Sequence, residues 1–222
     1  YDLLRTSAKW LFVMSVVLLV LVGLFGETVG GAKRWFHFGR FSVQPSEFAQ
    51  LALVLYLSDV LARRSDALHD FWRGLAPPLA ATGIAAGMVL MQPDLGTAIA
   101  MGSVALLLLG VAKARWQHLA IVAAVGVVAL VFLVAGAEYR RRRILAFMDP
   151  WKDPRGTGYQ ILQSFFAMAR GGVVGVGIGG SMQKLFFLPS AHTDFIFAII
   201  GEELGLVGST AVLGLFALLM AC

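Results

Sequence analysis

The residues of this chain with the clearest chemical potential are His192, Thr193 and Asp194, which precede an apolar stretch containing Glu202 and Glu203. A carboxylate such as Asp194 can act as a general base when it lies within about 3 Å of the proton that it removes. The alternative is a helix start, in which Thr193 caps the helix and Asp194 is favoured in the first turn by the helix dipole. Ionisable groups at or below a membrane surface are costly and are functional candidates by default. Both interpretations of the cluster stay open.

Four other carboxylates have a structural interpretation beside the functional one. Glu202 and Glu203 lie eight and nine residues after the aspartate of that cluster, about 12 Å further along a helix at 1.5 Å per residue. Hydrogen bonding inside a helix bundle is their favoured role, and the same holds for Asp94, in a tight turn between two apolar segments. Glu47 follows Ser46 at the start of an apolar segment. Ser46 can cap that helix, and Glu47 suits its positive end.

The run Arg140–Arg143 also allows two interpretations. Long basic side chains anchor helices at a membrane interface, but guanidinium groups also bind phosphate or pyrophosphate oxygens bidentately. One His and one Asp do not make a metal-ligand set, although oxygen ligands together with substrate phosphates could hold Mg²⁺. The sequence 175–180 matches G-x-G-x-x-G, but without a surrounding strand it predicts a turn and not a dinucleotide site.

The composition places these groups in a membrane protein. The 222 residues are 59% hydrophobic and only 14% charged, and the mean hydropathy is +0.80, whereas soluble domains are about one quarter charged. The net charge of +5 is therefore interpreted as helix anchoring and lipid or phosphate contact, with no nucleic-acid partner. The single cysteine, Cys222, excludes a disulfide within one copy.

The elements that must position the candidate residues are apolar helices. Spanning a bilayer takes about 20 residues, and the sequence predicts an all-α, polytopic membrane helix bundle in which residues 1–222 form a single membrane domain. The second and third of the predicted spans are short by that measure. The six spans are 8–26, 47–62, 75–91, 95–112, 116–137 and 194–220.

The distribution of Lys and Arg predicts the orientation of the bundle. Of the 18 such residues, the larger number lies in the long segments opposite the N-terminus, but the short loops on the N-terminal side have the higher density. The positive-inside rule weighs short loops, so the N-terminal side is predicted to be cytoplasmic. Residues 138–193 then form a long extracytoplasmic loop. Its turn-rich start at 149–154 and its amphipathic stretch at 159–170 predict a loop that lies on or dips into the membrane, and a loop of this length is usually functional.

The side opposite the N-terminus collects a set of short motifs in a specific order. In order and spacing they closely resemble the SEDS family of cell-wall polymerases, and the match covers essentially the whole chain. The Asp149-to-Gln160 region, together with Gln183-Lys184-Leu185, resembles the division branch of the family more than the elongation branch. The motifs are Arg34-Trp35, Gln44-Pro45-Ser46-Glu47, Gln92-Pro93-Asp94-Leu95-Gly96-Thr97, Arg142-Arg143, Asp149-Pro150-Trp151, Gly158-Tyr159-Gln160, Gln163-Ser164, Lys184 and His192-Thr193-Asp194.

The resemblance implies a fold, an activity and a site. Family members have ten spanning helices, so this chain is expected to be a fragment covering about the third to the eighth. The implied activity is that of an inverting peptidoglycan glycosyltransferase that polymerises lipid II, an undecaprenyl-pyrophosphate donor, with Asp194 as the catalytic carboxylate. The implied substrate-binding residues are Arg34, Trp35, Glu47, Asp94, Arg142, Arg143, Gln160, Lys184, His192 and Thr193.

The resemblance also implies partners and a location. We expect a Mg²⁺ or Mn²⁺ cofactor, a class B penicillin-binding protein transpeptidase and other divisome proteins as partners, and a place in the bacterial cytoplasmic membrane at the division site. Two positions depart from the family pattern: Gln50 replaces a Lys that is thought to partner the catalytic Asp, and Ser190 replaces a common Glu. A lipid II flippase and a non-catalytic division scaffold stay open as alternatives. Clustering of the motifs at one membrane face favours the polymerase over the flippase.

Overall fold

The computed structural model describes residues 2–29, 32–38, 41–189 and 191–221. The backbone forms two compact units, Tyr1–Leu130 and Val131–Cys222. The expected single membrane domain stays a prediction. Ser190 and Cys222, which the sequence singled out, lie outside the described residues.

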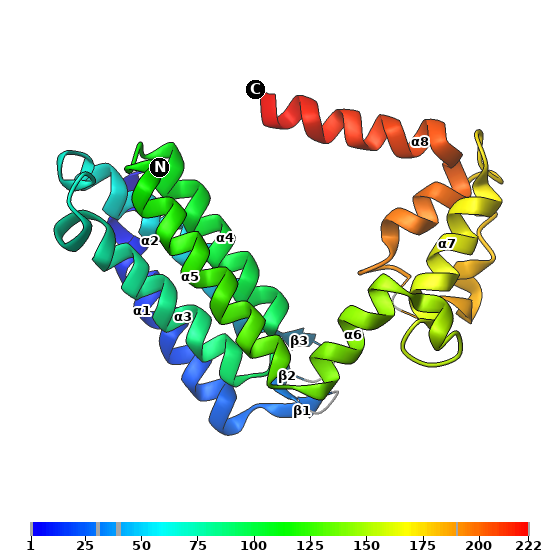
Figure 1. The fold of residues 1–222 in the computed structure, drawn as a ribbon, viewed down its shortest axis with the longest axis horizontal. Helices are drawn as coiled ribbons and strands as arrows, with labels where there is room; N and C mark the ends of the chain where they lie inside the picture. The colour runs from blue at the N-terminus through cyan, green and yellow to red at the C-terminus, as the bar shows by residue number, and fades with distance from the viewer. Residues whose placement is uncertain (1, 30–31, 39–40, 190, 222) are drawn as a thin grey trace. The chain divides into compact units, whose positions relative to one another are not determined.

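Helices dominate the first unit (Figure 1). α1 packs along α2, α3 packs along α4, and α2 also contacts α4. The buried interface mixes small residues such as Ala49 and Ala85 with Leu53 and Met101, because small side chains let apolar helices approach closely. The helices are α1 (Asp2–Phe25), α2 (Pro45–Arg63), α3 (Ala76–Met91), α4 (Leu95–Val111) and α5 (Trp116–Ala135), whose last turn crosses the boundary between the units.

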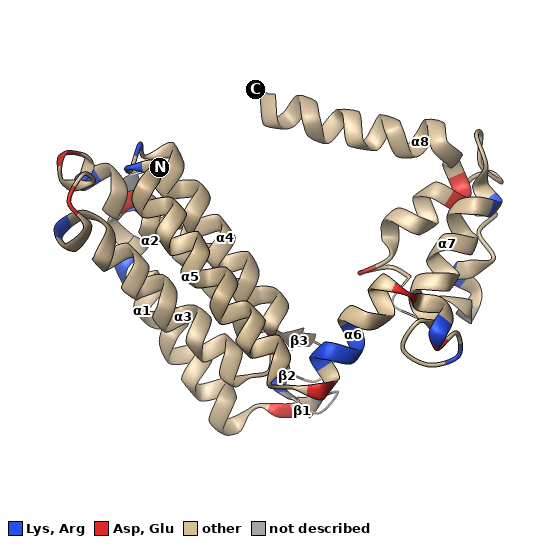
Figure 2. Cartoon of the chain, in the orientation of Figure 1, with Lys and Arg blue, Asp and Glu red and all other residues tan. Residues whose placement is uncertain are grey.

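Each of the six predicted spans is helical in the structure. Among the described residues, four helical stretches are long and apolar enough to cross a membrane: Leu4–Phe25, Phe71–Met91, Trp116–Ala135 and Ile196–Ala221. The helices α3, α4 and α5 contain no Lys, Arg, Asp or Glu (Figure 2). α4 is apolar but has 17 residues, and α2 carries Glu47 in its first turn and Arg63 in its last. The predicted spans 47–62 and 95–112, which correspond to α2 and α4, therefore do not meet the length and composition expected of a membrane-spanning helix.

The third predicted span is longer than the sequence indicated. A turn of π-helix, η2 (Phe71–Leu75), precedes α3. It forms because the Asp70 carboxylate accepts the backbone N–H groups of Trp72 and Arg73, at 2.9 and 3.3 Å. These bonds satisfy donors that a helix start otherwise leaves without partners. The stretch Phe71–Met91 thus reaches 21 residues.

The connection between α1 and α2 contains antiparallel strands that the sequence did not predict. β1 (Glu27–Val29) pairs with β2 (Ala32–Phe38), and β2 pairs with β3 (Phe41–Val43). Aromatic residues such as Trp35 and Phe36 favour extended backbone. A side-chain contact of 3.1 Å between His37 Nδ1 and Glu27 Oε2 also joins β2 to β1.

The second unit is built on α7 and α8. α7 (Tyr159–Gly171) confirms the predicted amphipathic helix: it buries Leu162, packs the buried Ala167 in one cluster with Ala198 of α8, and exposes Phe165. α8 (Ile196–Ala221) begins two residues after Asp194, so the alternative interpretation, in which Asp194 lies in the first helical turn, does not fit the structure. Shorter helices complete the unit: α6 (Glu138–Met148), η3 (Pro150–Lys152) and η4 (Gln183–Phe187).

Candidate functional site

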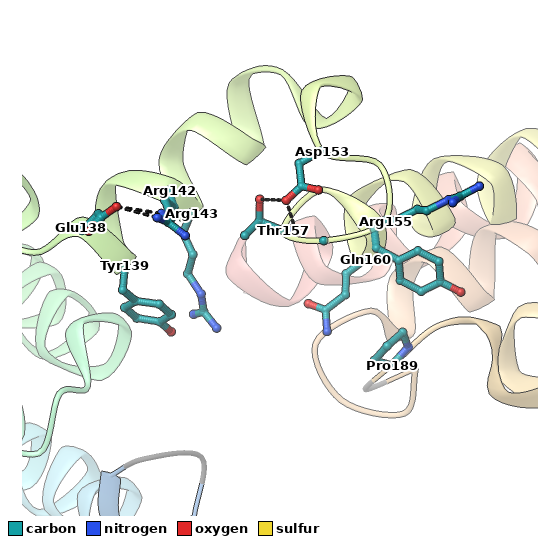
Figure 3. Close-up of a pocket in the computed structure, with 11 residues that line it drawn as sticks. Glu138, Tyr139, Arg142, Arg143, Asp153, Arg155, Thr157, Gln160 and Pro189 are labelled. Atoms are coloured by element: carbon teal, nitrogen blue, oxygen red, sulfur yellow. Dashed lines mark hydrogen bonds and ion pairs between the residues drawn. The ribbon is translucent and has the colours of Figure 1, made fainter.

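A cavity of about 780 Å³ lies among α6, the 153–157 turn and the start of α7 (Figure 3). Three guanidinium groups and two carboxylates line it, so its lining has a net positive charge. The lining residues are Glu138, Tyr139, Arg142, Arg143, Asp153, Arg155, Gly156, Thr157, Tyr159, Gln160 and Pro189.

The arginines of α6 are held by residues of their own helix. Arg142 donates to Glu138 Oε1 from Nη2 at 2.6 Å and from Nε at 3.2 Å. The side-chain hydrogen bond from Arg142 lowers the pKa of Glu138 below its ordinary value. The guanidinium of Arg143 lies 4.8 Å from the ring centroid of Tyr139, a cation–π contact. No described carboxylate forms an ion pair with Arg143, so its N–H groups can meet an anionic ligand.

Asp153 orders the turn that brings Arg155 to the cavity. Its Oδ2 accepts the Thr157 backbone N–H at 2.8 Å and the Thr157 hydroxyl at 3.1 Å. The backbone N–H of Thr157, followed by its hydroxyl, lowers the pKa of Asp153. A β-carbon at Gly156 would collide with this carboxylate, so the tight turn requires glycine there.

The cavity unites three of the predicted site residues and leaves others outside. Arg142, Arg143 and Gln160 line it together. Pro189 also lines it and precedes Asp194 by five residues, so the loop that leads to the predicted catalytic carboxylate borders the cavity. His192, Thr193 and Asp194 themselves are exposed and do not line it.

The Asp194 carboxylate is free to act on a ligand. Within the part of the chain that the structure describes, Asp194 has no hydrogen-bond or ion-pair partner. It lies in an exposed turn immediately before α8. Its role as the catalytic base stays a prediction.

Arg34 and Asp94 form a separate polar cluster in the first unit. Asp94 caps α4, because its Oδ1 accepts the Thr97 N–H at 3.1 Å and its Oδ2 accepts the Thr97 hydroxyl at 3.0 Å. Arg34 donates to the carbonyl oxygens of Gln92 at 2.7 Å and Pro93 at 2.6 Å, and its Nη1 lies 4.0 Å from Asp94 Oδ2. These bonds tie β2 to the turn between α3 and α4. The structural interpretation of Asp94 fits this geometry, and Trp35 is half-buried beside Arg34 on the same strand.

The start of α2 differs in detail from the prediction. The helix begins at Pro45, and Gln44 occupies the N-cap position without a side-chain capping bond. Ser46 is buried inside the helix and accepts a hydrogen bond from Gln44 Nε2 at 2.8 Å, so its predicted capping role was wrong. Glu47 is exposed in the first turn, as expected, and Gln50 is half-buried one turn later. The effect of Gln50 on Asp194 stays a prediction.

Lys184 has a carboxylate partner that the sequence did not reveal. Its Nζ lies 2.6 Å from Glu203 Oε1, and the residue does not line the cavity. Sequence reasoning also missed the cavity residues Asp153, Arg155 and Tyr139. An Asp that precedes Gly and Thr in a turn is a recognisable signal, and so is the Tyr139–Arg143 spacing of four residues on a helix.

The described residues do not supply a metal site by themselves. No group of three His, Cys, Asp or Glu side chains within the described ranges lies close enough together to hold an ion.

Comparison with known proteins agrees with the motifs. The sequence profile of the FtsW/RodA/SpoVE family, described as cell cycle protein, matches residues 1–222. A probable peptidoglycan glycosyltransferase FtsW of Geobacter metallireducens is 42% identical over 207 residues, which cover 93% of this chain and 55% of the relative. Stage V sporulation protein E of Bacillus subtilis is 42% identical over 218 residues, 97% of this chain and 60% of that protein. The chain thus spans a little more than half the length of these curated relatives.

Solved structures give the same answer. A chain from a structure described as "Structural coordination of polymerization and crosslinking by a peptidoglycan synthase complex" aligns with a TM-score of 0.73 and 36% identity, over 100% of this chain and 61% of that one. The rod shape determining protein RodA of Thermus thermophilus aligns with a TM-score of 0.64 and 27% identity, over 99% of this chain and 56% of RodA. The chain is an all-α, multi-pass membrane protein that belongs to the FtsW/RodA/SpoVE family.

Proposed function

We propose that the protein carrying this chain is a peptidoglycan glycosyltransferase that polymerises lipid II during cell division. The observation that carries the proposal is the cavity lined by Arg142, Arg143 and Arg155, bordered by the loop that leads to Asp194. Relatives named as probable peptidoglycan glycosyltransferases, at 42% and 48% identity, support the reaction class.

The proposed reaction is a displacement at the anomeric carbon of the donor sugar. The 4-hydroxyl oxygen of the acceptor attacks C1, and the bond from C1 to the phosphate oxygen breaks with inversion. The undecaprenyl pyrophosphate leaves with the bonding electron pair, and Asp194 takes the hydroxyl proton. A carboxylate with no described partner, in an exposed turn, is accessible to an acceptor hydroxyl and can accept its proton at a distance of about 3 Å.

The arginines of the cavity would stabilise the leaving group. Guanidinium groups make charge-assisted, bidentate hydrogen bonds with phosphate oxygens. Negative charge grows on the pyrophosphate as the C1–O bond breaks, so donors placed there stabilise the transition state more than the ground state. Arg143 and Arg155 fit this role better than Arg142, since neither forms an ion pair with a described carboxylate, whereas Arg142 is paired with Glu138.

A divalent cation and protein partners complete the proposal. The Mg²⁺ or Mn²⁺ expected from the family would be held largely by substrate phosphate oxygens, and no step above depends on it. We also propose a class B penicillin-binding protein transpeptidase and other divisome proteins as partners, at the division site of the bacterial cytoplasmic membrane.

Polymerisation of purified lipid II tests the proposal. The gene product that carries residues 1–222 is reconstituted in liposomes with the candidate transpeptidase, and glycan strands are separated by electrophoresis. Asp194→Asn should lower the rate by roughly 10²–10⁴, the usual cost of losing a general base, with near-normal lipid II binding. His69→Asn, an exposed position between α2 and α3, serves as the control. Polymerisation by Asp194→Asn within tenfold of the parent would refute the base assignment. Transfer of lipid II across the bilayer without any polymer would favour the flippase.

A further inference from the structure

α8 is interrupted at Gly205, about one turn after the buried Glu202. The backbone there has φ +66° and ψ −162°, outside the helical region. A break of this kind removes helical hydrogen bonds from residues on both sides, which is tolerated at membrane depth only when other groups replace them.

The segment 172–177 supplies the missing hydrogen bonds. The N–H groups of Val176 and Gly177 donate to the carbonyl oxygens of Glu202 and Glu203, both at 3.0 Å. In the other direction, Leu206 N–H donates to the Gly172 carbonyl at 2.9 Å, and Val207 N–H donates to the Val173 carbonyl at 3.1 Å. The loop therefore pairs with both sides of the break.

Glycines make this close pairing possible. A β-carbon at Gly171 would collide with the carbonyl of Gly201, and one at Gly175 would collide with the backbone of Glu203. Gly175 and Gly205 also have positive φ values of +82° and +66°, which L side chains rarely adopt. The loop and the broken helix are thus matched at the level of the backbone.

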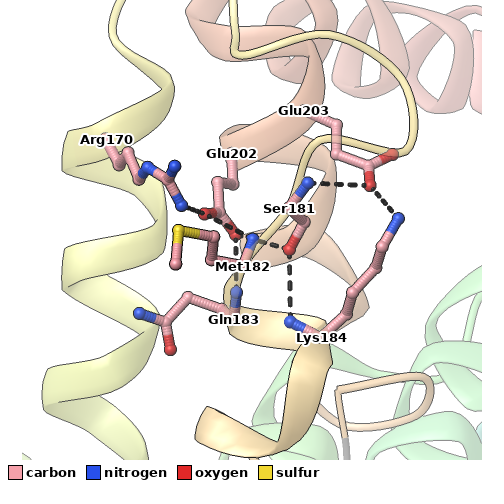
Figure 4. A network of polar contacts seen from close by, with 7 residues as sticks. All are labelled: Arg170, Ser181, Met182, Gln183, Lys184, Glu202 and Glu203. Atoms are coloured by element: carbon pink, nitrogen blue, oxygen red, sulfur yellow. Dashed lines mark hydrogen bonds and ion pairs between the residues drawn. The ribbon is translucent and has the colours of Figure 1, made fainter.

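The side chain of Glu202 binds residues 181–183, which follow the 172–177 segment along the chain (Figure 4). The residue is 0% exposed. Its carboxylate accepts the Ser181 hydroxyl at 2.5 Å, the Met182 N–H at 3.1 Å and the Gln183 N–H at 3.4 Å. Arg170 Nη1, from α7, adds an ion pair at 3.1 Å. A buried carboxylate is tolerable only with such a set of donors.

Glu203 makes a second, more exposed anchor beside the first. It accepts Lys184 Nζ at 2.6 Å and the Ser181 N–H at 3.4 Å. The Ser181 hydroxyl in turn accepts the Lys184 N–H at 3.2 Å. The two carboxylates thus hold residues 181–184 from one turn of α8.

The contacts of Glu202 and Glu203 with residues 181–184 bring together the two ends of the segment 184–203. We call this closed segment the ring; it contains the candidate base Asp194. The segment leaves the glutamates at Lys184, passes Pro189 at the cavity and Asp194, and returns to the same glutamates through the first turns of α8. Inside the ring, Leu188 and Ala191 are buried against Ala198. Asp194 has no described partner of its own, so its position depends on how the ring is held.

We propose that Glu202 and Glu203 are positioning residues that hold the Asp194-bearing segment in place, with Arg170 and Lys184 as their cationic partners. Lys184 then acts through Glu203 and not as a phosphate ligand, which revises the role implied by the family resemblance. The inference rests on the proposed function for its catalytic consequence, while the anchoring itself does not.

Two measurements on Glu203→Gln, Lys184→Met and the double variant test this proposal. Hydrogen exchange of the amides of residues 185–195 should accelerate about tenfold in each single variant. In the polymerisation assay each should lower kcat by roughly tenfold to a hundredfold, the cost of a misplaced catalytic group, with KM for lipid II changed less than threefold. The double variant should be no worse than either single one, because each single change already breaks the same ion pair. Asp149→Asn, which breaks the exposed Lys152–Asp149 pair in the same unit, is the matched control.

Each outcome decides the matter. Unchanged exchange at 185–195 in both single variants would overturn the anchoring, whatever the activity. A raised KM in Lys184→Met with normal kinetics in Glu203→Gln would show that Lys184 binds substrate directly, and would overturn its positioning role. If the parent protein makes no polymer, but exchange at residues 185–195 is faster in the variants than in the parent, the proposed function is refuted and the anchoring is supported.

Discussion

Removing Arg170 should destabilise the second unit, because its partner Glu202 cannot reach water. In Arg170→Met the side-chain length is kept and the charge is lost. Loss of one partner from a fully buried ion pair costs about 3–5 kcal/mol. Two features reduce that value here: Arg170 itself is 42% exposed, and Glu202 keeps its bonds from Ser181, Met182 and Gln183. The expected loss is therefore that of one hydrogen bond to a charged group, about 1.5–3 kcal/mol.

A second arginine of the same unit provides a matched control. Arg142 forms a shorter ion pair, 2.6 Å, but both it and Glu138 are 66% exposed. Exposed pairs contribute little, because water and salt screen them. Arg142→Met should therefore leave the unfolding free energy close to that of the parent, although its ion-pair distance is the smaller of the two.

Unfolding in mixed micelles, followed by circular dichroism as the fraction of denaturing detergent rises, compares the two variants. The reasoning requires Arg170→Met to shift the midpoint clearly and Arg142→Met to shift it little. Equal shifts would mean that burial of the carboxylate does not set the contribution, and a larger shift in Arg142→Met would mean that ion-pair distance sets it. A negligible shift in Arg170→Met would show that the three remaining donors suffice for Glu202.

Three further outcomes follow from particular contacts. Gly175→Ala should lower the unfolding free energy more than Gly177→Ala, because a β-carbon at Gly175 collides with the Glu203 backbone whereas one at Gly177 meets no atom within 4 Å. Both positions have positive φ, so Gly177→Ala carries only the backbone strain of about 1–3 kcal/mol. Equal losses in the two variants would contradict the close packing. In a cysteine-free background, Lys152→Cys should react with an impermeant thiol reagent in intact cells, whereas His69→Cys should react only after lysis; the reverse pattern would invert the predicted orientation. Arg142 lowers the pKa of Glu138, so the stabilisation from this pair is complete above the ordinary carboxyl pKa and is lost as the pH falls through the lower folded value. Arg142→Gln should raise the Glu138 pKa towards its ordinary value in a carboxyl-carbon NMR titration, and an unchanged titration would exclude the hydrogen bond in solution.

The helices could be predicted from the sequence because their signals are local. Apolar runs of about 20 residues indicated the spans, and the amphipathic pattern of apolar and polar residues at 159–170 indicated α7. The order of short motifs indicated the family, which the comparisons confirm. Arg142, Arg143 and Gln160 were predicted as site residues, and the cavity unites them.

The break in α8 could not be predicted, because its cause lies elsewhere in the chain. Gly205 follows Leu204 in an apolar run that continues a helix by any local criterion. The break at Gly205 is stabilised because Leu206 and Val207 donate to the carbonyl oxygens of Gly172 and Val173, about 30 residues earlier. The partners of Glu202 and Glu203 have the same non-local origin, so the sequence favoured a structural role for these residues without naming Arg170 or Lys184.

The run Arg140–Arg143 shows how identical neighbouring residues acquire different roles. Successive residues on a helix point about 100° apart, since one turn takes 3.6 residues. Arg140 donates to the carbonyl of Leu133 at 2.8 Å and so completes the end of α5, whereas Arg142 and Arg143 line the cavity. The anchoring and phosphate interpretations of this run are therefore not exclusive alternatives. Helix geometry allows one residue to stabilise a helix end while two others face the space where an anionic leaving group would bind.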